Sequence, residues 1–207
     1  MPPLSITVVT ATIPGREELL GKCIASVYAQ TRRLEAHLIM AQHTNPEMAG
    51  PQHCAVQQQW LLPAVTTDFT MRLADDDRLL PNYGEAVAPY LDKADVIYSW
   101  DASGSRPRVD CSDWPQDRLT STFETSNFVD GSAVLMRTSI LRSFGGWPAE
   151  WEGGSIFQGG HFKGFRSGYD DQTIFYLMAK AGARFLCVPQ ETWWYGEGPW
   201  PRLSTGG

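Results

Sequence analysis

The 207-residue sequence has little positive charge, no paired cysteines and no long apolar run, and each shortage excludes a class of protein. The chain has 17 basic and 23 acidic residues, which gives a formal net charge of −6. This charge disfavours a broad basic surface for duplex nucleic acid. No stretch approaches the roughly 18 apolar residues of a membrane-spanning helix. Cys23, Cys54, Cys111 and Cys187 form no C-x-x-C pair, so we expect free thiols rather than a zinc ribbon.

Several catalytic and targeting signatures are also missing. The sequence contains neither G-x-G-x-x-G nor G-x-x-x-x-G-K-[ST], so a dinucleotide fingerprint and a P-loop are absent. It has no G-x-S-x-G elbow and no H-E-x-x-H. We therefore expect its four histidines to be ordinary surface or cleft residues: His37, His43, His53 and His161. The N-terminal residues lack the charged and apolar segments of a secretory signal. We expect a cytoplasmic location, either free or peripheral at the inner membrane face.

The composition and the order of apolar segments predict a globular α/β fold. Hydrophobic residues make up 43% and charged residues 19%, and the length suits one domain over residues 1–207. The apolar runs predict four strands, and helical spacing predicts three helices between them. This alternation indicates a mostly parallel sheet flanked by helices. The expected strands cover residues 5–10, 37–41, 69–74 and 95–100, and the expected helices cover 16–29, 52–62 and 82–91.

The second half of the sequence is less regular. We expect a strand over 132–136, a helix over 138–144, a helix over 170–181 that ends at Gly182, and a strand over 184–188. Residues 145–168 hold eight glycines in 24 positions, which predicts a loop. Its part from 153 to 168 is a candidate lid over a substrate. The chain after 190 is aromatic and rich in Gly and Pro.

Asp75, Asp76 and Asp77 give the strongest local signal, because they directly follow an apolar strand. Ligands of open α/β sheets bind beyond the carboxyl ends of strands. Three adjacent carboxylates repel one another unless a cation or protons compensate, and hard oxygen ligands suit Mg²⁺ or Mn²⁺. An acidic turn that caps the next helix is the alternative. A calcium loop of the EF-hand type fits poorly, since Leu80 and Ala86 occupy the positions of its Gly and Glu.

A second acidic pair, Asp170 and Asp171, opens the helix expected after the glycine-rich loop. Acidic residues at a helix start often only cap backbone N–H groups. A carboxylate that faces a cleft can instead act as a general base on a nearby hydroxyl. A third segment, Thr10 to Arg16, follows the first strand, where Arg16 is able to reach a phosphate. This segment is weak evidence by itself.

The C-terminal aromatic residues have two readings. Trp193, Trp194, Tyr195 and Trp200 are able to stack on sugar rings or cover a bound donor. Packing in the core is the alternative, and it is the reading we favour for Trp193 or Trp194, since tryptophan buries a large area.

Taken in order, these segments resemble the GT-A-fold glycosyltransferases of family 2. The opening SITVVTATIPGR, and a helix that ends in Ser26-Val27-Tyr28-Ala29-Gln30-Thr31, resemble the family's first strand and helix. The Asp triplet followed by Pro81 is similar to the family's D-x-D region. The remaining matches are Gly131, Arg137, Phe144-Gly145-Gly146-Trp147, Asp170-Asp171 with Ile174 and Gly182, and Val188-Pro189.

The resemblance implies a Rossmann-like GT-A fold and a set of site residues. Asp171 takes the position of the catalytic base, with Asp170 beside it. The nucleotide-sugar would be bound by Thr10, Ala11, Thr12, Arg16, Asp75 and Asp76. A Mn²⁺ or Mg²⁺ ion would be held by Asp75, Asp76 and Asp77. Gly131, Trp147, Trp194 and Tyr195 are the candidates for contact with the donor sugar or the acceptor.

The function that follows is metal-dependent transfer of a sugar, with inversion, from a UDP-, GDP- or dTDP-sugar to an acceptor hydroxyl. Residues 1–101 would form the nucleotide-sugar half, and residues 102–207, with the loop at 145–168, the acceptor half. The chain departs from the family at 41–45, where an Asp-rich turn is replaced by AQHTN, and after Tyr195, where Glu197 is the candidate replacement for a metal-binding His. A sugar-phosphate nucleotidyltransferase and a non-catalytic carbohydrate-binding module are the alternatives.

Overall fold

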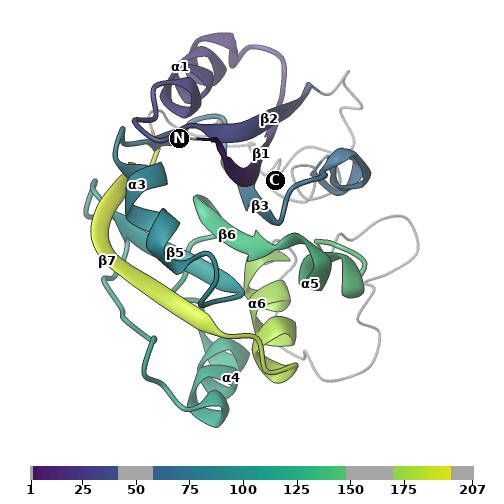
Figure 1. Ribbon diagram of the computed structural model, residues 1–207, viewed down its shortest axis with the longest axis vertical. Helices are drawn as coiled ribbons and strands as arrows, with labels where there is room; N and C mark the ends of the chain where they lie inside the picture. The colour runs from purple at the N-terminus through teal and green to yellow at the C-terminus, as the bar shows by residue number, and fades with distance from the viewer. Residues whose placement is uncertain (1, 42–57, 148–169, 197–207) are drawn as a thin grey trace, which may run out of the picture.

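The computed structural model describes residues 2–41, 58–147 and 170–196, whose strands form one seven-stranded sheet flanked by helices (Figure 1). The strands are β1 (Leu4–Thr12), β2 (Leu34–Ala41), β3 (Phe69–Arg72), β4 (Arg78–Leu79), β5 (Val96–Asp101), β6 (Val134–Arg137) and β7 (Phe185–Trp194). The helices are α1 (Glu17–Tyr28), α3 (Tyr83–Val87), α4 (Gln116–Thr125), α5 (Thr138–Ser143) and α6 (Asp170–Lys180), with 3-10 turns at Leu62–Ala64 and Ala88–Tyr90.

The sheet is mostly parallel. Its strand order is β2-β1-β3-β6-β5-β7-β4. Strand β1 runs parallel to β2 and β3, and β5 runs parallel to β7, whereas β6 is antiparallel to both β3 and β5. The carboxyl ends of β1, β3, β5 and β7 therefore share one edge of the sheet, and the chain enters β6 at that same edge.

Neighbouring side chains on a strand point to opposite faces of the sheet, and both faces are buried. Val8 packs into one core cluster and Val9 into the other. Helices α1 and α3 cover the first face, and α4, α5 and α6 cover the second. On the second face Phe123 of α4 meets Phe175 of α6, with ring centroids 5.7 Å apart. Two-sided burial explains why the central strands read as nearly continuous apolar runs.

The predicted elements are mostly present. Six strands and the helices at 16–29, 138–144 and 170–181 form close to where we expect them, and residues 82–91 form α3 and the 3-10 turn that follows it. Of the helix expected over 52–62, residues 58–61 are helical and 52–57 lie outside the described residues. Strand β4 and helix α4 were not predicted from the sequence. The strand expected over 184–188 is longer than predicted, since β7 continues through Trp194.

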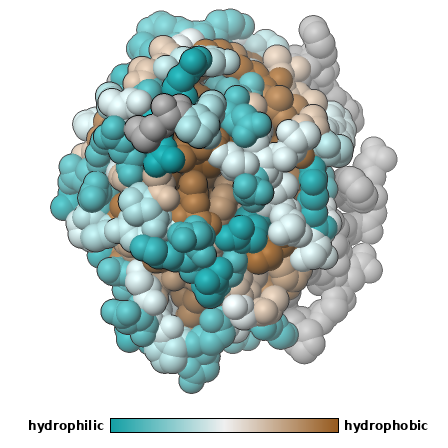
Figure 2. All heavy atoms as spheres, in the orientation of Figure 1, coloured by the Kyte–Doolittle hydropathy of each residue, from teal (hydrophilic) through white to brown (hydrophobic). Residues whose placement is uncertain are grey.

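The expectations about the cysteines and about membrane-spanning helices are tested for the described residues. Cys23, Cys111 and Cys187 are free and buried, while Cys54 lies outside the described residues, as does most of the loop at 145–168. Within the described ranges, no helix is both long and apolar enough to cross a membrane. On the face shown in Figure 2, hydrophobic residues are visible in a band down the middle of the view, between hydrophilic ones.

Candidate functional site at the carboxyl edge of the sheet

Several polar residues lie together at the carboxyl ends of the parallel strands. Thr12 ends β1, Asp75 follows β3 within three residues, Asp101 ends β5 and Tyr195 follows β7. Because β6 runs the other way, the residues that precede it, Asp130 to Ser132, lie at the same edge. This edge is where open α/β sheets bind their ligands.

Arg16 forms ion pairs with the first two residues of the Asp triplet. Its Nε donates to Oδ2 of Asp75 at 2.9 Å, and its Nη2 lies 2.8 Å from Oδ1 of Asp75 and 2.8 Å from Oδ2 of Asp76. Thr12 donates a further hydrogen bond to Oδ2 of Asp75 at 2.6 Å. All four residues are buried, so the charges of the two carboxylates are screened mainly by this guanidinium.

Asp77 faces a different set of partners. Its Oδ1 accepts the N–H of Gly196 at 2.8 Å, and Gly196 has a φ of 66°, a left-handed backbone that favours glycine. Burial raises the pKa of Asp77 to about 7, against hydrogen bonds from Ser132 and Gly196 that lower it. The third carboxylate of the triplet is therefore tied to the segments at β6 and β7.

Residues 130–132 connect the two acidic segments. The Oγ of Ser132 accepts the N–H of Ala74, directly before the Asp triplet, at 3.1 Å. On the other side Gly131 packs against Asp171 so closely that an added Cβ would lie 2.8 Å from the Cβ of Asp171. Almost a hundred residues apart in sequence, the triplet and Asp171 thus meet opposite sides of one short loop.

The backbone at this loop is strained. Ala133, which leads from Ser132 into β6, has a φ of 56°, the left-handed region that costs a residue with a Cβ roughly 1 kcal/mol or more. Its N–H bonds to the carbonyl of Arg72 at 2.8 Å, and its carbonyl accepts the buried hydroxyl of Tyr83 at 3.1 Å. These bonds hold the loop in its strained form, and the strain coincides with the point where the acidic segments meet.

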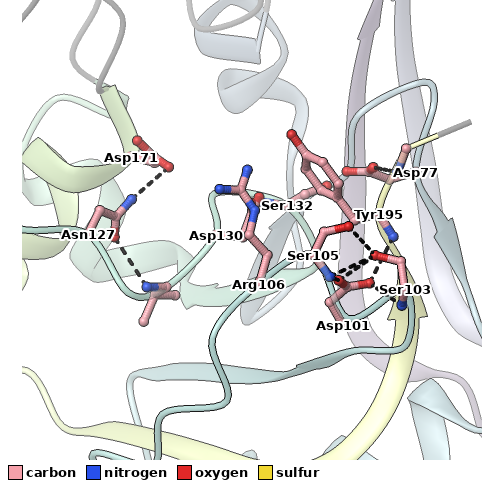
Figure 3. Close-up of polar contacts among 12 residues, drawn as sticks. Asp77, Asp101, Ser103, Ser105, Arg106, Asn127, Asp130, Ser132, Asp171 and Tyr195 are labelled. Carbon is pink, nitrogen blue, oxygen red and sulfur yellow. Dashed lines mark hydrogen bonds and ion pairs between the residues drawn. The ribbon is translucent and has the colours of Figure 1, made fainter. Parts of the chain in front are cut away.

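Asp171 is held at the start of α6 by two hydrogen bonds. Asn127 donates from Nδ2 to Oδ2 at 2.9 Å, as Figure 3 shows, and the N–H of Gln172 donates to Oδ1 at 2.8 Å. The second bond is the helix-start interaction that the sequence alternative predicts. The first fixes the carboxylate from the other side, and a general base needs such a fixed orientation. The backbone of Asp170 lies in α6, and its side chain lies outside the described part of the structure.

Asp130, Arg106 and Tyr195 occupy the space between these carboxylates in Figure 3. The Nε of Arg106 lies 2.6 Å from Oδ2 of Asp130, and its guanidinium carbon lies 4.4 Å from the ring centroid of Tyr195. Burial raises the pKa of Asp130, and the charge of Asp171 adds to this effect while Arg106 opposes it. A carboxylate that interacts electrostatically with Asp171 lies in the same site.

Asp101 organises the next loop. It accepts the N–H groups of Ser103 at 2.7 Å, Ser105 at 2.9 Å and Tyr195 at 3.1 Å. Burial opposes its charged form, but hydrogen bonds from Ser103, Tyr195 and Ser105 outweigh burial and lower its pKa. Asp101 is thus a buried anchor that joins the end of β7 to the loop that carries Arg106 (Figure 3).

The side chains available as metal ligands restrict how an ion would bind. In residues 2–41, 58–147 and 170–196, no three His, Cys, Asp or Glu side chains are grouped to hold a metal ion. Thr12 and Arg16 contact both oxygens of Asp75, which leaves Asp76 and Asp77 as the carboxylates best placed for a metal. Mg²⁺ bound together with phosphates needs only one or two carboxylates. The residues therefore fit an ion that binds with a diphosphate, rather than a cage of three carboxylates.

Three of the predicted ligand-binding residues are buried. Thr10 is fully buried and bonds to Nε2 of His37 at 2.9 Å, while Ala11 and Trp147 belong to the core. Their side chains are buried, so any contact with a ligand would be through the backbone, and their place in the site stays a prediction. Trp193 packs in the core at 2% exposure, as expected, whereas Trp194 is 38% exposed. The remaining predicted residues, His43, His53, His161, Glu197 and Trp200, lie outside the described ranges.

Five residues at this edge were not predicted from the sequence: Asp101, Arg106, Asn127, Asp130 and Ser132. Asp101 directly follows a predicted strand, and Asp130 directly precedes Gly131, so the edge rule applied to every strand would have found both. Arg106 lies in a loop with no periodic pattern, and no local signal marks it.

Comparison with known proteins identifies the fold. No protein-family model matches the chain, and no curated protein matches its sequence. Among solved structures, residues 1–349 of S. aureus TarS in complex with UDP-GlcNAc match with a TM-score of 0.65 at 13% identity, over 98% of this chain and 61% of that one. The mannosyltransferase PcManGT from Pyrobaculum calidifontis, in complex with GDP-Man and Mn²⁺, matches with a TM-score of 0.60 at 14% identity, over 92% of this chain and 56% of that one.

These matches establish the architecture. The fold is of the GT-A type, as the resemblance predicts. The chain spans about three fifths of the length of these two structures. At such low identity the likeness fixes the fold and leaves the chemistry to the residues of this chain.

Proposed function

We propose that the chain transfers a sugar from a nucleotide-sugar donor to a hydroxyl acceptor, with inversion at the anomeric carbon. The observation that supports this is the loop 130–132, which contacts Asp171 through Gly131 and the start of the Asp triplet through Ser132. A donor needs its diphosphate and its reacting carbon within one site, and the acceptor needs a base beside it. The two acidic segments, on opposite sides of one loop, meet that requirement.

In this proposal residues 1–101 bind the nucleotide-sugar and residues 102–207 bind the acceptor. Arg16 and Thr12 hold Asp75 in place, and Asp76 and Asp77 would bind an ion together with the diphosphate. A Mn²⁺ or Mg²⁺ ion bound there would neutralise the charge that develops on the departing diphosphate. PcManGT, of the same fold, was solved with GDP-Man and Mn²⁺, which supports a divalent ion.

Asp171 is the proposed general base. Its carboxylate takes the proton of the acceptor hydroxyl as that oxygen bonds to the anomeric carbon, and the bond from this carbon to the diphosphate oxygen breaks. Asn127 and the N–H of Gln172 hold the carboxylate in position for this proton transfer. A fixed geometry of donor, acceptor and base lowers the entropic part of the barrier. Attack from the face opposite the diphosphate inverts the anomeric configuration.

A panel of nucleotide-sugars, measured by thermal unfolding with and without Mn²⁺, tests the proposal. A donor at about 100 times its dissociation constant stabilises the folded state by about 2.7 kcal/mol, and we expect this effect only with the ion present. Release of nucleoside diphosphate from that donor would establish turnover. Release of pyrophosphate from a sugar phosphate and a nucleoside triphosphate would instead indicate a nucleotidyltransferase. A donor that binds without turnover would favour a non-catalytic module.

A further inference from the structure

The ion pair of Arg106 and Asp130 lies between the two ends of the proposed site. Gly131, next to Asp130, packs against Asp171, and Ser132 accepts the N–H of Ala74, directly before the Asp triplet. Figure 3 shows the pair between Asp171 and Asp77. The sugar of a donor must lie between its diphosphate and the base. The transferred sugar would therefore pass beside this pair, which no step of the proposed chemistry uses.

The pair is built so that one partner is fixed and the other is accessible. Asp130 accepts the N–H of Ser132 at 2.9 Å, and its side chain is only 12% exposed. The side chain of Arg106 is 44% exposed and lies over the ring of Tyr195. The carboxylate thus has a rigid backbone anchor, while the guanidinium presents N–H donors toward solvent.

A small pocket adjoins the pair. It is lined by the polar residues Arg106, Asp130, Asp101 and Ser132 and by the half-buried aromatic residues Trp100 and Phe128. Carboxylate acceptors and guanidinium donors beside an aromatic surface are the chemistry that suits the hydroxyl groups and C–H face of a sugar. A guanidinium also offers two parallel donors, so it distinguishes how neighbouring hydroxyls are oriented.

We propose that Arg106 and Asp130 recognise hydroxyl groups of the transferred sugar and so help to select the donor. Asp130 accepts hydrogen bonds from these hydroxyls and Arg106 donates to them. This inference rests on the proposed function, since it places the donor sugar between Asp171 and the Asp triplet. The competing explanation is structural: the pair would only fasten the loop after β5 to the residues before β6.

Binding of matched ligands separates the two explanations. Two nucleotide-sugars, UDP-GlcNAc and GDP-mannose, are titrated separately in the presence of Mn²⁺ into the wild type, Asp130→Asn and Arg106→Ala. The corresponding nucleoside diphosphates, UDP and GDP, are titrated in the same way for comparison. Arg106→Ala guards against a folding failure of the more buried variant. We expect each variant to bind the preferred nucleotide-sugar about tenfold or more weakly, because a hydrogen bond to a charged group is lost. Binding of the corresponding nucleoside diphosphate should change by less than about twofold.

Arg108→Ala is the matched control. Arg108 lies two residues further along the same loop, pairs with Glu191 and is half exposed, but it does not line the pocket. It should leave both affinities unchanged. Equal losses for nucleotide-sugar and nucleoside diphosphate, or no loss for either, in Arg106→Ala would overturn the inference alone. A wild type that binds neither class of ligand would reject the proposed function, and this inference with it.

Discussion

Arg16 and Asp75 form a two-point contact, with Nε to Oδ2 at 2.9 Å and Nη2 to Oδ1 at 2.8 Å, although 59 residues separate them in sequence. This contact joins the loop after β1 to the loop after β3. Such paired hydrogen bonds between guanidinium and carboxylate are strong and fix orientation. Since Arg16 also reaches Asp76, one buried cation supports the whole first part of the acidic triplet.

Replacement of Arg16 by Ala should therefore destabilise the protein strongly. Two buried carboxylates would lose their cation, and removal of one partner of a buried pair typically costs about 3–5 kcal/mol. Denaturant unfolding at neutral pH measures this change. Lys22→Ala serves as a control, since the pair of Lys22 with Glu18 on α1 is exposed and worth about 0.5 kcal/mol or less. A loss below about 1 kcal/mol for Arg16→Ala would show that the carboxylates are compensated in another way.

Gly131→Ala should impair both stability and transfer. The new Cβ would lie 2.8 Å from the Cβ of Asp171 and 3.1 Å from its Oδ2, so the carboxylate has to move. Overpacking of this kind costs about 1–3 kcal/mol. Thermal unfolding and the release of nucleoside diphosphate measure the two effects.

Gly21→Ala is the matched control for this substitution. Gly21 lies on the exposed side of α1, and an added Cβ there meets nothing within 4 Å. Alanine should stabilise that helix by about 0.5–1 kcal/mol and leave transfer unchanged. If Gly131→Ala behaved like Gly21→Ala, the close approach of loop 130–132 to Asp171 would not matter for function.

The stability of the metal-free protein should depend on pH through Asp77. Burial raises the pKa of Asp77 from an ordinary value of 3.8 to about 7, so the folded state holds a proton that the unfolded state has lost. Stability from this residue is full below about pH 4 and is lost as the pH rises through about 7. The wild type minus Asp77→Asn difference in unfolding free energy should fall across that window, by at most about 1.4 kcal/mol per pH unit. A difference that stays flat from pH 4 to 8 would contradict the buried, protonated state.

Much of the fold could be predicted from the sequence because the central strands are buried on both faces. Their apolar runs are distinct, and the helices between them have clear periodicity. Strand β4, with two residues, is too short for any pattern, and α4 begins after Pro115 with mostly polar residues. The extension of β7 over 190–194 depends on pairing with β5 and β4, which the local sequence does not encode.

The site could be predicted only in part, for a similar reason. The acidic segments stand out because unpaired charges are costly, and this signal pointed to the triplet Asp75, Asp76 and Asp77 and to the pair Asp170 and Asp171. The sequence could not show that Arg16 would contact both oxygens of Asp75, since a contact between residues 59 positions apart depends on the fold. Nor could it show that Thr10, the first residue of the segment that ends at Arg16, is fully buried and bonds to His37. The cytoplasmic location, the lid and the division into two halves stay predictions.

The most direct test of the account compares Asp171→Asn with the wild type in two measurements on the same samples: Mn²⁺-supported donor binding, and release of nucleoside diphosphate. Asp117→Asn, an exposed carboxylate on α4, is the control and should match the wild type in both. We predict that Asp171→Asn keeps its donor affinity within about threefold but turns over at least 10²-fold more slowly, roughly the contribution of a general base. Turnover equal to that of the wild type would remove Asp171 from the reaction and contradict the single site in which the two acidic segments act together.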